Sequence, residues 1–153
     1  MGRARKTAAK AAPPVAFGPY HTVIIPKPPS VNAMYANVSD AARATAIARG
    51  RKPRGRKKTG EAHVWSAEAA WEILRTKPPR MERHYELVIE LGRRAGTDLG
   101  NYEKAVSDLL QAMGIVRNDS LCEDLRIKWA ADLPSTKARI SWRAVTLEVA
   151  HVR

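Results

Sequence analysis

The chain has 153 residues, of which 44% are hydrophobic, a length typical of one domain that buries its own core. Its single cysteine, Cys122, cannot form an internal disulfide, so nothing points to an oxidising compartment. No apolar run approaches the roughly 18 residues that a membrane-spanning helix needs, and residues 1–20 lack the apolar centre of a secretory signal. We therefore expect a soluble, cytoplasmic protein without a membrane partner.

The net charge of +12 is confined to two short segments. Residues 1–10 carry four basic residues and no acid, and the rest of the chain outside both segments holds 15 basic and 15 acidic residues. Such segments bind polyanions by releasing counterions, so we expect contact with nucleic acid. A solubilising tail and loop is the alternative. The second segment carries eight basic residues and no acid: Arg43, Arg49, Arg51, Lys52, Arg54, Arg56, Lys57 and Lys58.

The first part of the chain is predicted to contain one strand and a long basic loop. Residues 1–16 are typical of a flexible basic arm. Tyr20–Ile25 is rich in β-branched and aromatic residues and indicates a strand, which a run of prolines ends. Residues 37–60 form a basic insertion, expected as a flexible loop in which Ala41–Ala48 could be a short helix.

A helix and a strand are predicted next. Ser66 is a suitable N-cap for a helix over Ser66–Arg75, with Trp71 and Leu74 as core anchors. Alternation over Arg83–Leu91 predicts a half-exposed strand whose apolar face is made by Tyr85, Leu87, Ile89 and Leu91.

An amphipathic helix follows, because Val106, Leu109, Leu110 and Met113 recur at helical spacing, and Gly114 ends it. Two more strands are predicted over Leu125–Ala131 and Ala138–Val149, joined as a hairpin. Residues 17–153 are therefore predicted to form a single small α+β domain with a mixed four-stranded sheet and two principal helices.

Two isolated acids flank the amphipathic helix, and a lysine lies in its first turn. Asp98 precedes the helix, Asp119 follows it, and Lys104 and Asp108 lie four residues apart. Hard cations held by carboxylates activate water for phosphodiester hydrolysis, and a lysine can stabilise charge on a phosphate. The alternatives are that Asp98 is an acid favoured at the start of a helix by its dipole, that Asp119 is an ordinary turn residue, and that Lys104 lies on a solvated helix face. Spacing alone leaves both interpretations open, and no P-loop, CxxC or HExxH motif suggests another chemistry.

Several sequence blocks, taken in order, resemble the RusA family of Holliday-junction endonucleases. Residues 28–32 (PPSVN) with Tyr35 are similar to the family's N-terminal PPSxN block, and residues 63–68 are similar to the segment that opens its first helix. The most specific block is residues 98–104 (DLGNYEK), followed by Asp119. The resemblance covers nearly all of the chain except the N-terminal arm and the basic insertion.

The resemblance implies a homodimeric, Mg²⁺-dependent nuclease on a mixed α/β scaffold that resolves four-way DNA junctions by paired symmetric nicks. Mn²⁺ could substitute for Mg²⁺. Asp98 and Asp119 match the family's metal-binding and catalytic aspartates, and Lys104 matches its functional lysine. A DNA-associated, bacterial or phage-encoded protein of DNA recombination and repair fits this description.

One position departs from the family pattern, because Gly100 stands where the second motif aspartate is expected. With one carboxylate fewer, the site offsets less of the free energy that dehydration of Mg²⁺ costs. Either another acid or a water molecule takes the place of the missing aspartate, or catalysis is lost. Asp108 is the nearest candidate for a substitute metal ligand. The expected DNA-binding residues lie in the insertion and beside the acids: Arg49, Arg51, Lys52, Arg54, Arg56, Lys57, Lys58, Arg93, Arg94 and Asn101.

Two rival functions stay open. A junction-binding protein whose cation site is weakened or inactive would keep the basic segments without cleaving DNA. A basic RNA-binding protein would fit the charge but leave the pattern of acid, helix and acid unexplained.

Overall fold

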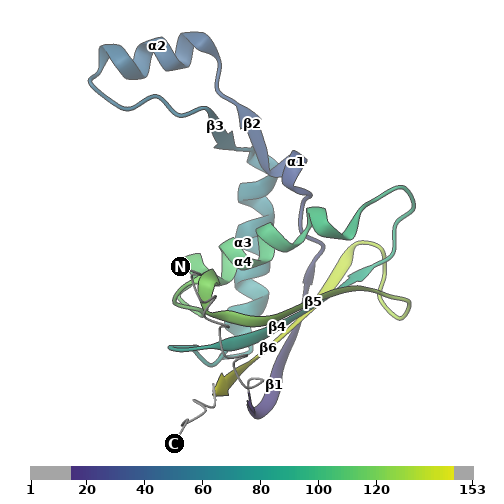
Figure 1. Cartoon of the computed structure of the whole chain (residues 1–153). Coiled ribbons are helices and arrows are strands. Elements are labelled where there is room, and N and C mark those ends of the chain that lie inside the picture. Colours follow the sequence, from purple (N-terminus) through teal and green to yellow (C-terminus); the bar gives the residue numbers. More distant parts are fainter. Residues whose placement is uncertain (1–14, 147–153) are drawn as a thin grey trace, which may run out of the picture.

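A computed structural model describes residues 15–146; residues 1–14 and 147–153 lie outside the described part, and for residues 15–17 only the backbone is described. The predicted N-terminal arm and the end of the last predicted strand therefore fall largely outside it. The α+β class and the mixed four-stranded sheet are confirmed (Figure 1). In chain order the elements are β1 (Val15–Pro26), α1 (Val31–Met34), β2 (Tyr35–Asn37), α2 (Asp40–Ala48), β3 (Arg56–Lys58), α3 (Gly60–Arg75), β4 (Tyr85–Gly92), η1 (Leu99–Asn101), α4 (Glu103–Ala112), η2 (Asp119–Leu121), β5 (Cys122–Ala130) and β6 (Lys137–Thr146).

The main sheet has the order β1-β6-β4-β5, in which β4 and β5 are parallel and the other pairs antiparallel. The predicted hairpin between the last two strands is therefore wrong, because β4 lies between β5 and β6. The connection from β5 to β6 crosses the end of β4, where a Cβ atom on Gly92 would lie 1.8 Å from the carbonyl oxygen of Pro134. Gly92 permits this close approach of two backbones.

The hydrophobic core lies between one face of the sheet and two helices, α3 and α4. The predicted apolar face of β4 is confirmed, since each of its four residues is at most 1% exposed, but the prediction of a half-exposed strand is wrong because no residue of β4 is exposed. Across the sheet, Leu87 is paired with Trp142 and Ile89 with Ile140, so these side chains point to the same face. The predicted apolar stripe of α4 also packs there: Val106, Leu109 and Leu110 are buried, and Met113 is half-buried against them. Gly114 ends this helix with a positive φ of 67°.

Helix α3 begins six residues earlier than predicted. Thr59 is its N-cap and accepts a hydrogen bond from the backbone N–H of Ala62, whereas the hydroxyl of Ser66 donates to the carbonyl oxygen of Ala62 inside the helix. The prediction that Trp71 and Leu74 anchor the core is also wrong, because they are 65% and 58% exposed.

The buried stripe of α3 consists instead of Ala62, Trp65, Ala69 and Ile73. These residues follow helical spacing on the face opposite Trp71. Although α3 has 16 residues, neither it nor any other helix within residues 15–146 is long and apolar enough to cross a membrane.

The opposite face of the sheet carries ion pairs instead of helices. Glu86, whose side chain is 8% exposed, accepts hydrogen bonds from the hydroxyl of Tyr20 and from Nε of Arg143, both at 2.6 Å. Burial acts to raise the pKa of Glu86, but these two hydrogen bonds and the charges of Arg143 and Arg126 together outweigh it and hold the pKa below its ordinary value of 4.5.

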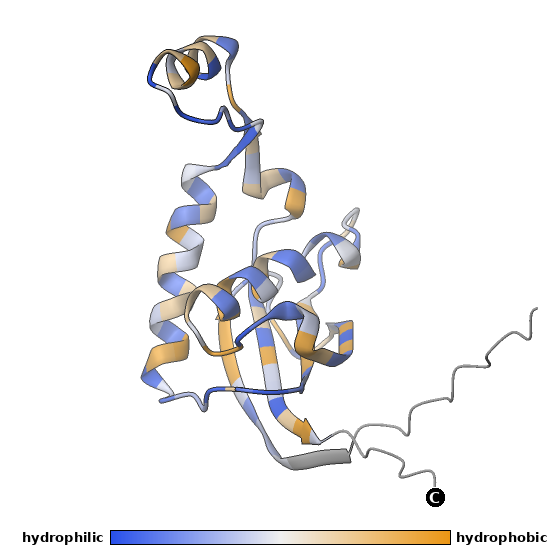
Figure 2. Ribbon diagram, turned by 60° about the vertical axis from the view of Figure 1, so that its left-hand side comes forward, coloured by the Kyte–Doolittle hydropathy of each residue, from blue (hydrophilic) through white to orange (hydrophobic). Residues whose placement is uncertain are grey.

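The basic insertion is not a loop but a folded projection of residues 35–58. We call this projection the arm, and it is distinct from the predicted N-terminal arm. Strands β2 and β3 pair antiparallel from Tyr35 opposite Lys58 to Asn37 opposite Arg56, and the predicted short helix between them is confirmed as α2. The arm extends away from the main sheet (Figure 1), and its strands and connections are largely hydrophilic (Figure 2).

Candidate functional site

The acids and the lysine predicted from the sequence lie on or next to α4 and the two 3-10 helices that contact it. Asp98 is the N-cap of η1, Lys104 is in the first turn of α4, and Asp119 is the first residue of η2. Helix α4 contacts both 3-10 helices. The fold thus brings Asp119 close to Lys104, although they are 15 positions apart in sequence.

Lys104 is held by the carboxylate of Asp108 and faces that of Asp119. Its Nζ donates to Oδ1 of Asp108 at 2.6 Å and lies 4.0 Å from Oδ2 of Asp119. The hydrogen bond to Asp108 raises the pKa of Lys104, the two carboxylates add to this effect, and burial opposes it. The side chains of Lys104 and Asp119 are 47% and 52% exposed, so both are open to a ligand from solution.

Asp98 has a different environment from the other two acids. Its Oδ1 accepts a hydrogen bond from the backbone N–H of Gly100 at 3.2 Å, and its side chain is exposed. Within residues 15–146, no three His, Cys, Asp or Glu side chains form a group that could hold a metal ion. Asp98, Asp108 and Asp119 are therefore not assembled into a site of three carboxylates.

Tyr35 is a member of this site whose role the sequence did not indicate. Its hydroxyl donates to Oδ2 of Asp108 at 3.1 Å, so both oxygens of Asp108 are engaged, one by Tyr35 and one by Lys104. Burial raises the pKa of Tyr35, and the hydrogen bond to Asp108 adds to this effect. Arg56 stacks on the ring of Tyr35, with its guanidinium carbon 5.6 Å from the ring centroid. The contact between Tyr35 and Asp108 joins residues 73 positions apart, so no local pattern could have revealed it.

Gly100, which replaces the expected second acid, leaves open space at its position. A Cβ atom added there would meet only Oδ1 of Asp98, at 3.9 Å, which is an ordinary contact distance. Neither steric crowding nor a positive φ therefore requires glycine here.

Of the three predicted DNA-binding residues next to the acids, Arg94 lines a cleft and the other two do not. Arg94 lines a cleft of about 670 Å³ together with Lys27, whereas Arg93 is exposed and Asn101 half-buried. Burial lowers the pKa of Lys27, and the charge of Arg94 adds to this effect. The Nζ of Lys27 donates to the carbonyl oxygen of Gly92 at 3.0 Å and lies 5.0 Å from the centroid of the Tyr102 ring.

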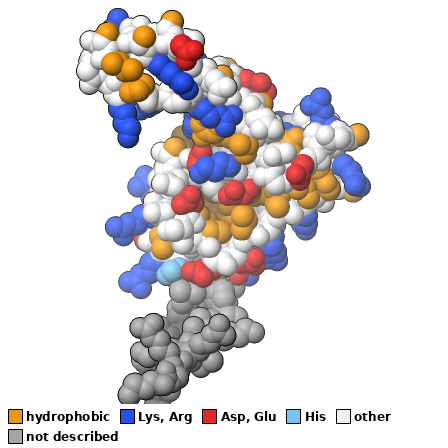
Figure 3. Space-filling view, turned by 45° about the horizontal axis from the view of Figure 1, so that its top comes forward, with side chains coloured by type: hydrophobic (Ala, Val, Ile, Leu, Met, Phe, Trp, Pro, Cys, Tyr) orange, Lys and Arg blue, Asp and Glu red, His pale blue; other side chains and the backbone are white. Residues whose placement is uncertain are grey.

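The predicted DNA-binding residues of the insertion are all exposed on the arm. Four of them, Arg51, Lys52, Arg54 and Lys57, line a cavity of about 750 Å³, whereas Arg49, Arg56 and Lys58 lie outside its lining. Basic side chains also stand along the edges of the face in Figure 3, where acidic and hydrophobic side chains lie nearer the middle.

Comparisons with known proteins do not identify the chain. No model of a protein family matches it, and no curated protein matches it.

Proposed function

We propose that the chain is a Mg²⁺-dependent endonuclease that acts on branched DNA such as four-way junctions, as its resemblance to the RusA family implies. The observation that carries the proposal is the position of Lys104. Its ammonium is hydrogen-bonded to Asp108 and lies 4.0 Å from the carboxylate of Asp119. The ammonium suits a reaction in which a phosphate gains negative charge, and the exposed carboxylate beside it offers oxygen ligands to a metal ion.

Asp98 and Asp119 are suitable for holding Mg²⁺, because both carboxylates are exposed oxygen donors. Mg²⁺ keeps several of its waters and is often bound through one or two carboxylates together with substrate phosphates, so a cluster of three acids is not required. Mn²⁺ would accept the same oxygen ligands. When bound, the ion activates water and offsets charge on the leaving oxygen.

Lys104 would act on the scissile phosphate, and Asp108 would position it. Its raised pKa keeps the ammonium charged at neutral pH, so it can donate a hydrogen bond to a phosphate oxygen. Asp108 is fixed at one oxygen by Tyr35 and is left with one oxygen to orient Lys104. The ammonium therefore need not reorganise when charge develops on the phosphate.

A homodimer would place one such site on each of two strands, since a two-fold axis repeats every contact. Arg93, Arg94 and Asn101 would contact the phosphates that flank the cleaved bond.

A labelled four-way junction incubated with the protein tests this proposal. We expect paired symmetric nicks with Mg²⁺ or Mn²⁺, none with EDTA, and none with Asp98→Asn or Asp119→Asn. Asp132→Asn is a matched control, because it removes an exposed acid in the connection between β5 and β6. Junction binding without cleavage in either metal would overturn the proposal.

A junction-binding protein without nuclease activity is the second candidate. Gly100 and the lack of a three-carboxylate group within residues 15–146 favour it. The same experiment separates the two candidates, because this one predicts a shifted but uncleaved junction.

A further inference from the structure

The arm is folded but has no hydrophobic core of its own. None of the nine residues of α2 is buried, and Ile47 is 62% exposed. Local hydrogen bonds define its shape instead. Ser39 caps α2 by accepting from the N–H of Ala42, and the carbonyl oxygen of Gly55 accepts from Nη2 of Arg43. Burial of apolar surface is the main driving force of folding, so an element without it gains stability from whatever it binds.

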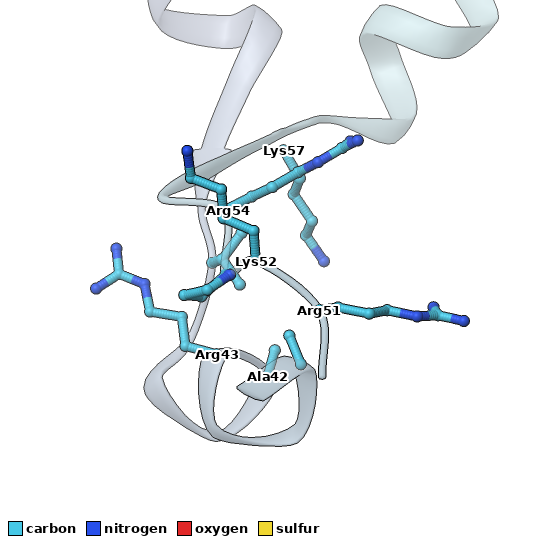
Figure 4. A pocket seen from close by; sticks show the side chains of 9 residues that line it. Ala42, Arg43, Arg51, Lys52, Arg54 and Lys57 are labelled. Carbon is cyan, nitrogen blue, oxygen red and sulfur yellow. The ribbon is translucent and has the colours of Figure 1, made fainter. Parts of the chain in front are cut away.

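A cavity of about 750 Å³ lies between α2 and the segment that leads to β3. Its apolar lining residues are small: Val38, Ala42, Ala46 and Pro53. Five cations complete the lining, and no acid does: Arg43, Arg51, Lys52, Arg54 and Lys57. Figure 4 shows Arg43 and Arg51 extending outward on opposite sides, with Lys52 and Arg54 between them.

The charge of the arm is strongly unbalanced. Residues 35–58 contain eight basic residues and a single acid, Asp40. Asp40 lies 3.7 Å from Arg43, and its side chain is fully exposed, so it offsets little of the charge around the cavity. Like charges brought together in this way repel one another until anions neutralise them.

We propose that this cavity binds the sugar–phosphate backbone of duplex DNA. The cations at its rim would hold successive phosphates, and the apolar residues of its floor would contact the deoxyribose between them. Binding through the backbone carries no base preference. The cavity would therefore be a sequence-independent DNA-binding site, separate from the site at Lys104. The choice of DNA over RNA rests on the proposed function, whereas the phosphate chemistry does not.

An anionic membrane surface fits the arm less well. Helices that lie on membranes present a flat apolar face with large residues such as Trp, Phe and Leu. The lining of this cavity is concave, and its apolar members are valine, alanine and proline. Small apolar residues and five cations therefore suit an anionic chain better than a planar membrane surface.

Salt-dependent binding to a short duplex DNA in EDTA tests the proposal, because no cleavage interferes. The informative variant is Lys52→Gln/Arg54→Gln, and the matched control is Lys77→Gln/Arg80→Gln, which removes the same charge from two exposed residues outside the arm and the cavity. We expect the cavity variant to lose about tenfold in affinity and to lower the slope of log K against log salt by about 1.8, or 0.9 for each lost phosphate contact. The control variant should lose clearly less.

The same binding measurement is repeated with a duplex RNA of the same length and with vesicles of anionic phospholipid. Three outcomes would overturn the proposal: an equal loss of DNA affinity in both variants, tighter binding of the wild type to the RNA, or a loss of affinity in the cavity variant that is seen only with the vesicles. Circular dichroism and thermal unfolding should be the same for both variants, because neither pair of side chains is buried.

Cleavage of the four-way junction by the same variants keeps this proposal apart from the nuclease proposal. If Mg²⁺ produces no nicks but the cavity variant still loses more DNA affinity than the control, the nuclease proposal is wrong and the proposal for the cavity is supported. If the junction is cleaved and both variants bind DNA equally, the proposal for the cavity is wrong and the nuclease proposal is supported.

Discussion

The hydroxyl of Tyr35 donates a hydrogen bond to Oδ2 of Asp108 at 3.1 Å. Tyr35 is the first residue of the arm, and Asp108 lies one turn beyond Lys104 on α4. At the other strand of the arm, Arg56 stacks on the Tyr35 ring and donates to its carbonyl oxygen at 3.4 Å. Two hydrogen bonds, from Tyr35 to Asp108 and from Lys104 to Asp108, therefore connect the base of the arm to the candidate catalytic lysine.

Removal of the Tyr35 hydroxyl should weaken cleavage without unfolding the protein. In Tyr35→Phe, one oxygen of Asp108 loses its donor, so Asp108 and the ammonium of Lys104 are held less firmly. A hydrogen bond to a charged group is worth about 1.5–3 kcal/mol, and loss of its lower value from the transition state slows kcat roughly tenfold. We expect kcat for junction cleavage to fall while KM changes little, since Tyr35→Phe removes no charge that contacts DNA.

Tyr20→Phe is the matched control for this prediction. It also removes a hydrogen bond between tyrosine and a carboxylate, that of Tyr20 to Glu86, but on the opposite face of the sheet. Tyr20→Phe should lower the unfolding temperature and leave kcat unchanged. Similar kcat values for both variants would mean that Tyr35 has only a structural role.

An acid at position 100 should strengthen the binding of Mg²⁺. The position has room for a side chain, and its nearest neighbour would be Oδ1 of Asp98 at 3.9 Å. In Gly100→Asp, a second carboxylate next to Asp98 adds anionic oxygens for a hard cation. We expect a lower Mg²⁺ concentration at half-maximal cleavage.

The neutral variant Gly100→Asn has nearly the same shape and should not produce this shift. An equal response of both variants, or a weaker response to Mg²⁺ in Gly100→Asp, would place the metal away from Asp98.

The stability of the sheet should depend on pH through Glu86. Its pKa is lower in the folded protein than the ordinary value of 4.5, so its ion pairs stabilise the folded state above about pH 4.5. This contribution is lost as the pH falls through the lowered pKa. Glu86→Gln should therefore unfold at a lower temperature than the wild type near neutral pH, and the difference should shrink below about pH 4.5. A difference that stays constant with pH would contradict the role of the Glu86 charge.

The parts of the fold that were predicted correctly depend on local spacing. Alternation identified the buried face of β4, and helical spacing identified the buried stripe of α4 and placed Lys104 one turn from Asp108. These patterns act over at most one or two turns, so the sequence displays them directly. The parallel pairing of β4 with β5 could not be found in this way, because it depends on a crossover and on the backbone approach at Gly92.

The candidate site was predicted in part for the same reason. Lys104 and Asp108 are neighbours in sequence, but Tyr35 reaches Asp108 only through the fold. The arm was mistaken for a loop because its strands are three residues long and carry no buried side chains. Its stability comes from caps and from a few hydrogen bonds, which hydrophobic patterns do not reveal.

The error in α3 leads to a sharp test of its register. Trp71 and Leu74 were predicted as core residues, but Ala62 and Ala69 place the buried stripe on the other side, together with Ile73. Ile73 is 0% exposed and its neighbour Leu74 is 58% exposed. Ile73→Ala removes buried methylene groups and leaves a cavity, so it should lower the free energy of unfolding by about 2–5 kcal/mol. Leu74→Ala should change it by less than about 0.5 kcal/mol. Urea unfolding of the two variants measures both values, and a larger loss for Leu74→Ala would reverse the assigned face of α3.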